Sequence, residues 1–165
     1  MESAAVAIEF LGIKGTPEEV MKEWSDRAAV AYKGLPMKAG GYDYLQNLST
    51  KGVKIAMATS APKQLCEIAL NTHNINKFFN AVCRSEEVGV GKNKPDVFLL
   101  AAKKIGVSPS DCIVYEDSII AMKTAKATGM AVCAVYDESS SESWEEAKQI
   151  ADYAIKDFKE EIPWK

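Results

Sequence analysis

The sequence lacks the long apolar runs and the basic excess that mark membrane and nucleic-acid-binding proteins. No apolar run approaches the roughly 20 residues that a membrane-spanning helix needs. The N-terminus has no basic stretch before its short apolar segment, so a signal peptide is not expected. The net charge of -3 and the pI near 5.3 argue against a nucleic-acid surface, because phosphate backbones attract basic faces. We therefore expect neither a membrane nor a nucleic acid as partner.

Cysteine and histidine are also scarce. The cysteines form no C-x-x-C pair, and they lie in apolar patterns at Cys66, Cys83, Cys112 and Cys133. Structural zinc favours closely spaced ligands, so a zinc site is not expected. Buried free thiols would fit a reducing compartment, and we expect a cytoplasmic location. The single histidine, His73, has no nucleophilic-serine motif beside it, so a hydrolase triad finds no support.

The N-terminal part of the chain has a helical pattern only. The expected helices cover residues 3–11 and 17–33, and the second begins with the N-cap pattern Thr16-Pro17 followed by two acids. A helical segment of about 35 residues is too short to bury its own apolar face. We therefore expect residues 1–35 to pack on another part of the protein or on a partner.

From residue 36 onward strands and helices alternate. The expected strands are 53–58, 80–84, 112–116, 131–135 and 153–155, and the expected helices are 42–48, 62–73, 95–105, 118–128 and 142–150. Strands that are separated by helices of about ten residues predict a parallel sheet with right-handed crossovers. We therefore expect an α/β fold, with a Rossmann-like parallel sheet and flanking helices over residues 36–165.

Two acids directly follow the apolar run 112–115. They are Glu116 and Asp117, and a helical pattern starts at Ser118. The carboxyl edge of a parallel sheet is where α/β proteins bind ligands, and carboxylate oxygens suit Mg²⁺. Alternatively, Asp117 caps the helix that starts at Ser118, and Glu116 assists it. Both interpretations remain open on position alone.

Two further stretches contain candidate anion ligands. Thr59 and Ser60 follow an expected strand and precede a helix, where hydroxyl and backbone donors can bind an anion; the simpler interpretation is a helix cap. Lys92 lies between glycines and a proline-initiated helix, from where it can reach a neighbouring strand end and neutralise a phosphate. Otherwise Lys92 is a solvated loop lysine, and Lys94 competes with it for any role.

The order of these stretches resembles the haloacid dehalogenase-like (HAD) phosphohydrolases. The matching segments are VKIAMATSAPKQL, GKNKPDVFLLAAKKIGVSPSDCIVYEDS and AKATGMAVCAV, and the resemblance spans about residues 36–158. Within the superfamily, the chain is most similar to the helical-cap phosphatases and β-phosphoglucomutase-like enzymes. The resemblance implies a small phosphorylated substrate, such as a sugar phosphate or nucleotide. It also implies Mg²⁺ and an aspartyl-phosphate intermediate, while residues 1–33 would be part of the cap.

The resemblance also assigns roles to the candidate residues. Thr59, with Ser60, would bind the transferring phosphoryl group. Lys92 would be the catalytic lysine that bridges this phosphate and the nucleophile. Asp117, with Glu116 beside it, would bind or position Mg²⁺.

The chain departs from the family pattern in two places. The family usually reads K-P-x-P-D where this chain reads KNKPD. The missing first proline weakens the assignment of Lys92 rather than Lys94 as the motif lysine. More importantly, the sequence contains no D-x-D, the motif that supplies the family's nucleophile and its general acid and base. We therefore expect an N-terminally truncated member that is inactive or nearly so. The alternative is a non-catalytic phosphate-binding or partner module.

The missing motif also implies a missing central strand. In this family the first strand lies beside the strand that ends at Glu116. Without it, the strands at 53–58 and 112–116 must pair directly or leave a gap with unpaired backbone groups. We expect either direct pairing or a marginal fold that self-associates through the exposed sheet.

Overall fold

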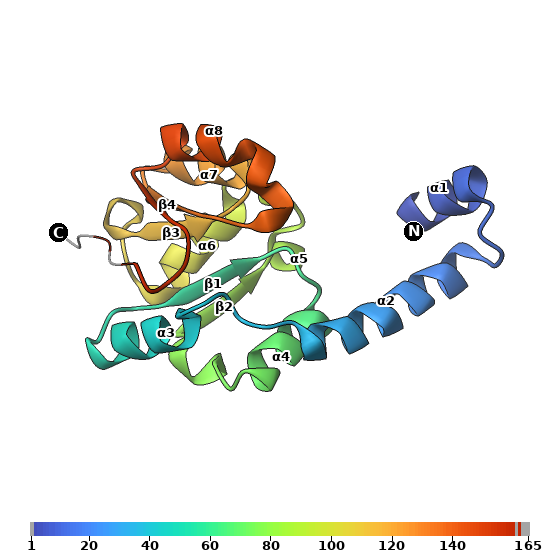
Figure 1. Ribbon diagram of the computed structural model, residues 1–165, viewed down its shortest axis with the longest axis horizontal. Coiled ribbons are helices and arrows are strands. Elements are labelled where there is room, and N and C mark those ends of the chain that lie inside the picture. The colour runs from blue at the N-terminus through green and yellow to red at the C-terminus, as the bar shows by residue number, and fades with distance from the viewer. Residues whose placement is uncertain (1, 161, 163–165) are drawn as a thin grey trace.

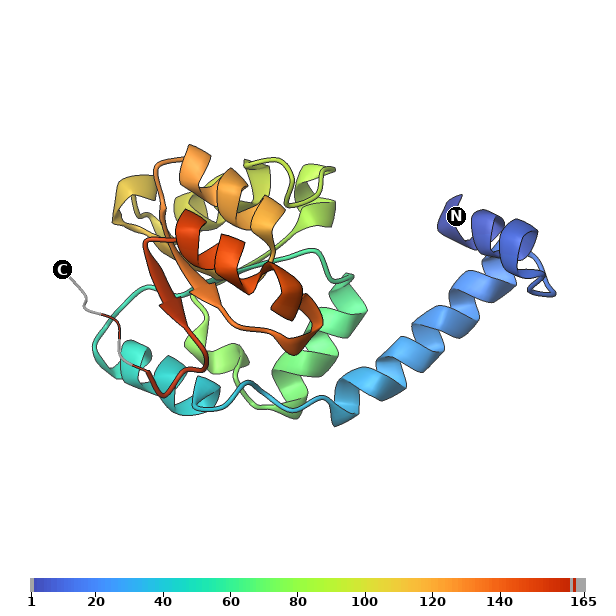
Figure 2. The ribbon, with the colours of Figure 1, turned by 45° about the horizontal axis from the view of Figure 1, so that its top comes forward.

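The computed structural model describes residues 2–160 and residue 162 of the chain. Its N-terminal part is an arm that contains α1 (Glu2–Leu11) and α2 (Pro17–Gly34). Figures 1 and 2 show α2 projecting from the core, with α1 folded back at its far end. The opposite end of α2 packs on α4 (Lys63–Thr72).

The arm leaves most of its apolar surface open. Ala7 and Val20 are buried where α1 and α2 pack on each other. In contrast, Phe10 is 76% exposed, Leu11 74% and Val30 72%. The described residues of the core therefore cover little of the apolar surface on this arm.

The described part of the core holds two separate parallel sheets. β1 (Ala56–Thr59) pairs with β2 (Ala81–Arg84). β4 (Ala131–Val135) lies between β3 (Ile113–Glu116) and β5 (Tyr153–Ile155) in the second sheet. No pairing joins β1 to β3 within the described ranges. The expected single sheet is thus divided: a gap separates the two strands, and the direct pairing that we considered does not occur.

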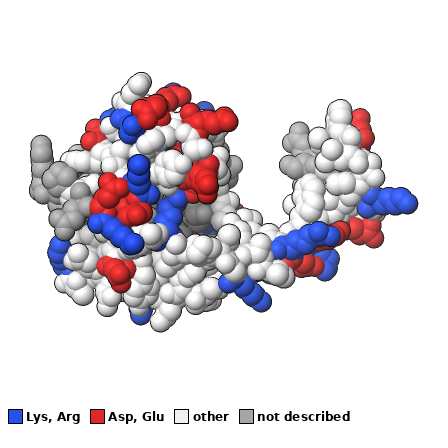
Figure 3. Space-filling view, in the orientation of Figure 1, with Lys and Arg blue, Asp and Glu red and all other residues white. Residues whose placement is uncertain are grey.

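Helices cover both sheets and confirm the α/β class. Besides α4, they are α3 (Gly41–Thr50), α5 (Ser85–Val88), α6 (Asp96–Ile105), α7 (Ile119–Ala127), α8 (Trp144–Ile150) and the 3-10 helices at Asn76–Phe78, Pro109–Asp111 and Glu138–Ser143. α6 packs on β1 and β2, whereas α7 packs on β3 and β4. Figure 3 shows acidic and basic side chains interspersed over the core, so this face has no large area of a single charge.

Three expected segments differ from the structure. β1 begins at Ala56 rather than at residue 53, because the N–H of Ile55 donates to the Asn80 side chain and the ladder starts after it. Residues 85–94, between the expected strand 80–84 and the expected helix 95–105, contain the short helix α5, whose start is held by Glu87 Oε1 accepting the N–H of Arg84. Residues 138–143, at the expected start of the helix 142–150, form a 3-10 helix because Asp137 caps it.

The core buries its cysteines as free thiols. Cys66, Cys83 and Cys133 are buried and Cys112 is partly buried, with no disulfide among them. Burial raises the pKa of Cys133 to about 12, so this thiol stays protonated at neutral pH. Among the residues that the structure describes, no helix has the length and apolarity needed to span a bilayer.

Candidate active site

The carboxyl ends of three strands meet at one edge, although the two sheets are separate. Thr59 ends β1 and is the register partner of Arg84, which ends β2. The hydroxyls of the following residues, Ser60 and Ser85, lie 3.1 Å apart. The loop after α5 carries a lysine that reaches the end of β3 in the second sheet. Contacts between loop residues at this edge therefore connect the two sheets.

Lys92 is that lysine, and its partner is Glu116. Lys92 Nζ donates to Glu116 Oε2 at 2.7 Å. Glu116 is 7% exposed, and the Lys92 side chain is 25% exposed. Burial acts to raise the pKa of Glu116, but the Lys92 charge, its hydrogen bond and nearby donors outweigh it, so the pKa lies below its usual range. The pair is thus a charged ion pair at neutral pH.

Glu116 also accepts backbone N–H groups just before α7. Its Oε1 accepts the backbone N–H groups of Asp117 and Ser118, both at 3.2 Å. Ser118 is the N-cap residue but makes no side-chain cap bond. The capping alternative expects Asp117 to cap the helix with the assistance of Glu116. In the structure, the two N–H groups donate to Glu116 instead. The side chain of Asp117 is therefore not the cap of α7.

Asp117 is a partly buried carboxyl group that lies beside other acids. Burial, followed by the neighbouring Glu116 and by Asp137, raises the pKa of its carboxyl group. A cation at this position would lower the pKa again and stabilise the ionised form. The described residues contain no group of three or more Asp, Glu, His or Cys that could hold a metal alone. Mg²⁺ commonly binds one or two carboxylates plus substrate phosphate oxygens, and Asp117 beside Glu116 fits such a shared site.

Thr59 and Ser60 do not cap α4. Thr59 Oγ1 accepts the N–H of Ala61 at 3.0 Å and closes a short turn. The N-cap position of α4 is Pro62, and the first N–H of the helix donates to the side chain of Glu86 at 2.9 Å. The Thr59 hydroxyl, which only accepts here, can therefore still donate to an anion, and Ser60 can do so when Ser85 is the donor between their two hydroxyls. One N–H at the start of α4 is already occupied.

Lys94 is placed differently from Lys92. Its backbone N–H closes a turn onto Gly91 O at 3.0 Å. Its side chain forms no ion pair with any residue in the described ranges, and only Lys92 reaches the acids of β3. The structure thus brings Lys92, Glu116 and Asp117 together.

Two features of this edge were missed by sequence reasoning. Lys38, between α2 and α3, pairs with Asp137 after β4 at 2.6 Å, and this pair is 99 positions apart, so no local pattern indicates it. Its hydrogen bond and that of Ser139 hold the pKa of Asp137 below its usual range. Arg84, at the end of β2, has a buried Nε without a partner in the described part. The signal for Arg84 was its place before Ser85, which parallels Thr59 before Ser60.

The comparisons with known proteins agree on one family. The family model described as "Hydrolase: haloacid dehalogenase-like hydrolase" matches residues 5–129. A probable pseudouridine-5'-phosphatase of Drosophila melanogaster is 32% identical and is matched over 96% of this chain and 71% of its own length. A phosphorylated carbohydrates phosphatase of Thermotoga maritima is 28% identical, over 78% of this chain and 60% of its own length.

A solved structure shows the same likeness in three dimensions. A putative β-phosphoglucomutase from Thermotoga maritima superposes with a TM-score of 0.78 at 25% identity, over 94% of this chain and 72% of that one. The chain spans a smaller part of some relatives. It covers 36% of a bifunctional riboflavin kinase/FMN phosphatase of Arabidopsis thaliana, to which it is 29% identical over 82% of its own length.

Proposed function

Because the chain belongs to the haloacid dehalogenase-like hydrolase family, we propose that its strand edge binds the phosphoryl group of a small phosphorylated metabolite for phosphohydrolase chemistry. The observation that carries this proposal is the pairing of Lys92 with the buried Glu116 beside Asp117. An ammonium held at the carboxyl edge of parallel strands is suited to neutralise a bound phosphate.

The residues divide the work by their chemistry. Thr59 and Ser60 supply hydroxyl donors to phosphate oxygens at the end of β1. Lys92 supplies the positive charge, and its ion pair with Glu116 fixes where that charge lies. Asp117, with Glu116 beside it, would hold Mg²⁺. When bound, the ion supplies charge neutralisation at the phosphoryl group.

The sequence holds no D-x-D, and this limits the proposal for the chain itself. In the family, a carboxylate attacks phosphorus, and the acids described at this edge are already placed as a lysine partner and a metal ligand. We therefore propose that these 165 residues bind phosphate but do not turn over phosphate esters. This amounts to a phosphate-binding module of the family fold, and its free thiols suit a reducing compartment such as the cytoplasm.

Phosphate-dependent stabilisation tests the binding site. Inorganic phosphate with Mg²⁺ should raise the melting temperature of the chain relative to chloride at equal ionic strength, because ligands that bind only the native state stabilise it. Lys92→Met should abolish this rise, whereas Lys94→Met, in the same loop, should keep it. An equal rise in both variants would place the anion elsewhere and refute the site.

Hydrolysis of p-nitrophenyl phosphate with Mg²⁺ tests the catalytic limit. We expect no turnover above that of a buffer blank. Turnover that disappears in Asp117→Ala would show that the chain is catalytic in spite of the missing motif. Phosphate binding without turnover would support the proposal as stated.

A further inference from the structure

Two segments of the candidate site come from different parts of the chain and must be held at a fixed spacing. The hydroxyls of Thr59 and Ser60 lie between β1 and α4, whereas Lys92 lies in the loop after α5. A phosphoryl group that contacts both segments depends on this spacing, because a hydrogen bond weakens steeply as its donor and acceptor move apart or out of line. The contacts between α5 and the start of α4 therefore bear directly on the site.

α5 is joined to the start of α4 by two hydrogen bonds. Glu86 Oε1 accepts the backbone N–H of Lys63 at 2.9 Å. The hydroxyls of Ser60 and Ser85 lie 3.1 Å apart and form the second bond. The partners in these bonds are 23 and 25 positions apart in the chain. The two bonds hold the turn that carries the Thr59 and Ser60 hydroxyls against α5.

The start of α4 depends on the Glu86 carboxylate. The N-cap residue Pro62 makes no side-chain cap bond, and no acid occupies the first turn of this helix. A carboxylate is stabilising at the first N–H groups of a helix, where the helix dipole places positive charge. Glu86 supplies from a distant segment the acceptor that serine, threonine or aspartate usually supplies at the N-cap. Its bond to Lys63 thus links two elements as well as capping one of them.

The next acid in the chain, Glu87, holds α5 on its other side. Its carboxylate accepts the N–H of Arg84 at 3.0 Å and pairs with Lys104 of α6 at 2.7 Å. The two successive acids of α5 therefore bind different helices, Glu86 at α4 and Glu87 at α6. A single helical turn is not stable by itself. These two acids consequently determine where α5 lies.

Lys92 follows α5 closely in the chain. α5 ends at Val88, and Gly89 adopts a left-handed conformation with φ of 72° that ends the helix. The short segment 89–91 then leads to Lys92, whose ammonium group donates to Glu116 at 2.7 Å. The position of α5 therefore sets the point from which Lys92 reaches the end of β3.

We propose that Glu86 is a positioning residue of the phosphate site. Its hydrogen bond to the start of α4 fixes the distance between the hydroxyls of Thr59 and Ser60 and the ammonium group of Lys92. The carboxylate bonds to a backbone N–H and acts through the position of α5 and of the loop that follows it. This inference rests on the proposed function, because it adds a residue on which the same phosphate site depends.

Two substitutions at one position separate the hydrogen bond from the charge. Glu86→Gln and Glu86→Ala both remove the negative charge, but glutamine keeps an oxygen that can accept the N–H of Lys63. In titration calorimetry with Mg²⁺ present, inorganic phosphate should bind Glu86→Ala about fivefold more weakly than Glu86→Gln. Equal or tighter binding by Glu86→Ala would overturn the proposal, because Glu86 would then only compete with phosphate for the start of α4.

Asp152 provides a matched control for lost stability. Its carboxylate accepts the N–H of Val132 at 2.8 Å, near the amino ends of β4 and β5 and so at the opposite end of the second sheet from the site. Asp152→Ala should have a lower melting temperature than Asp152→Asn, but the two should bind phosphate equally. A difference of about fivefold between them would show that lost stability alone weakens phosphate binding, and it would overturn the role of Glu86.

The side-chain signal of Lys92 tests the positioning without phosphate. In proton–nitrogen correlation spectra of the lysine ammonium groups, this signal is assigned by its loss in Lys92→Arg. It should shift or broaden in Glu86→Ala and stay in place in Glu86→Gln and Asp152→Ala. An unchanged signal in Glu86→Ala would overturn the proposal. If the unchanged chain binds no phosphate, the proposed function fails, whereas this signal still decides whether Glu86 positions Lys92.

Discussion

The Lys92–Glu116 pair is the residue-scale feature on which the site depends. Lys92→Met leaves the buried Glu116 carboxylate without its cation, and we expect a loss of about 2–4 kcal/mol in the free energy of unfolding at pH 7. The double variant Lys92→Met/Glu116→Gln removes both charges but keeps an oxygen that can cap α7. It should recover most of this loss, as measured by urea denaturation.

The same pair predicts a pH dependence. The folded-state pKa of Glu116 is lowered from 4.5, so its contribution to stability is present above about pH 4.5 and is lost as pH falls through the folded-state pKa. In Lys92→Met, burial instead raises that pKa, so the carboxyl binds a proton on folding. The stability deficit of this variant should therefore shrink between pH 7 and pH 4. A deficit that is constant over this range would mean that Glu116 does not respond to the lysine charge.

Sequence reasoning at the residue scale worked where chemistry lies in a short segment. Glu116 and Asp117 follow an apolar strand directly, and Lys92 precedes a proline-initiated helix, so both stretches can be found by pattern. Which of two adjacent acids accepts the N–H groups before α7 depends on backbone geometry that no spacing encodes. The Lys38–Asp137 pair joins distant segments and could not be predicted without the fold.

At the scale of elements, α2 is stabilised at its start by a local device. Thr16 Oγ1 accepts the N–H of Glu19, and the Glu19 carboxylate accepts the N–H of Thr16. Thr16→Ala should cost the helix about 1 kcal/mol, so amide exchange in the first turn of α2 should speed up about fivefold. Glu18→Gln, next to this capping box but outside it, should change that exchange much less. Equal acceleration in the two variants would show that the capping box does not stabilise α2.

The bounds of most helices and strands could be predicted from the local sequence. They could not be predicted where a residue distant in the sequence forms a hydrogen bond at the end of the element. The strands at 131–135 and 153–155 have the predicted bounds. The start of β1 depends on Asn80, whose side chain replaces one strand partner. The helix α5 is a single turn that is held by Glu87, too short for a periodic pattern to reveal.

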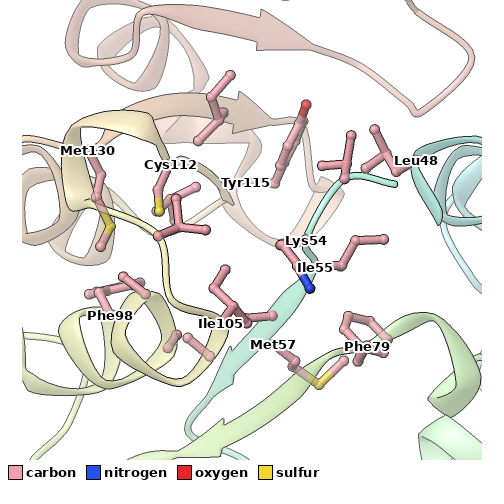
Figure 4. A pocket seen from close by; sticks show the side chains of 18 of the residues that line it. Leu48, Lys54, Ile55, Met57, Phe79, Phe98, Ile105, Cys112, Tyr115 and Met130 are labelled. Carbon is pink, nitrogen blue, oxygen red and sulfur yellow. The ribbon is translucent and has the colours of Figure 1, made fainter. Parts of the chain in front are cut away.

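At the scale of the whole molecule, the α/β class and the family follow from the order of the motifs. The sequence predicted either direct pairing of the strands at 53–58 and 112–116 or a gap between them, and it did not decide between the two. Direct pairing of β1 and β3 would satisfy their backbone edges, but α6 packs on β1 and β2, whereas α7 packs on β3 and β4. The two helices share one apolar core between the sheets. Residues of α3 and α6, with residues of β1 and β3, line a cavity of about 500 Å³ between the two strands (Figure 4).

This arrangement predicts opposite effects of one substitution at two buried alanines. Ala101 in α6 lines the cavity and is 8% exposed, whereas Ala125 in α7 lies in the packed core and is fully buried. Ala101→Leu adds apolar atoms into open space and should raise the free energy of unfolding by roughly 1–2 kcal/mol. Ala125→Leu overfills a close-packed site and should lower it by roughly 1–3 kcal/mol.

The cavity, rather than helix propensity, must account for that difference in sign, because leucine is a good helix former at both positions. Urea denaturation of the two variants beside the unchanged chain gives the comparison. If Ala101→Leu destabilises the chain as much as Ala125→Leu does, the space between β1 and β3 is closed in solution. The two sheets would then pack on each other, and the cavity between β1 and β3 would be absent.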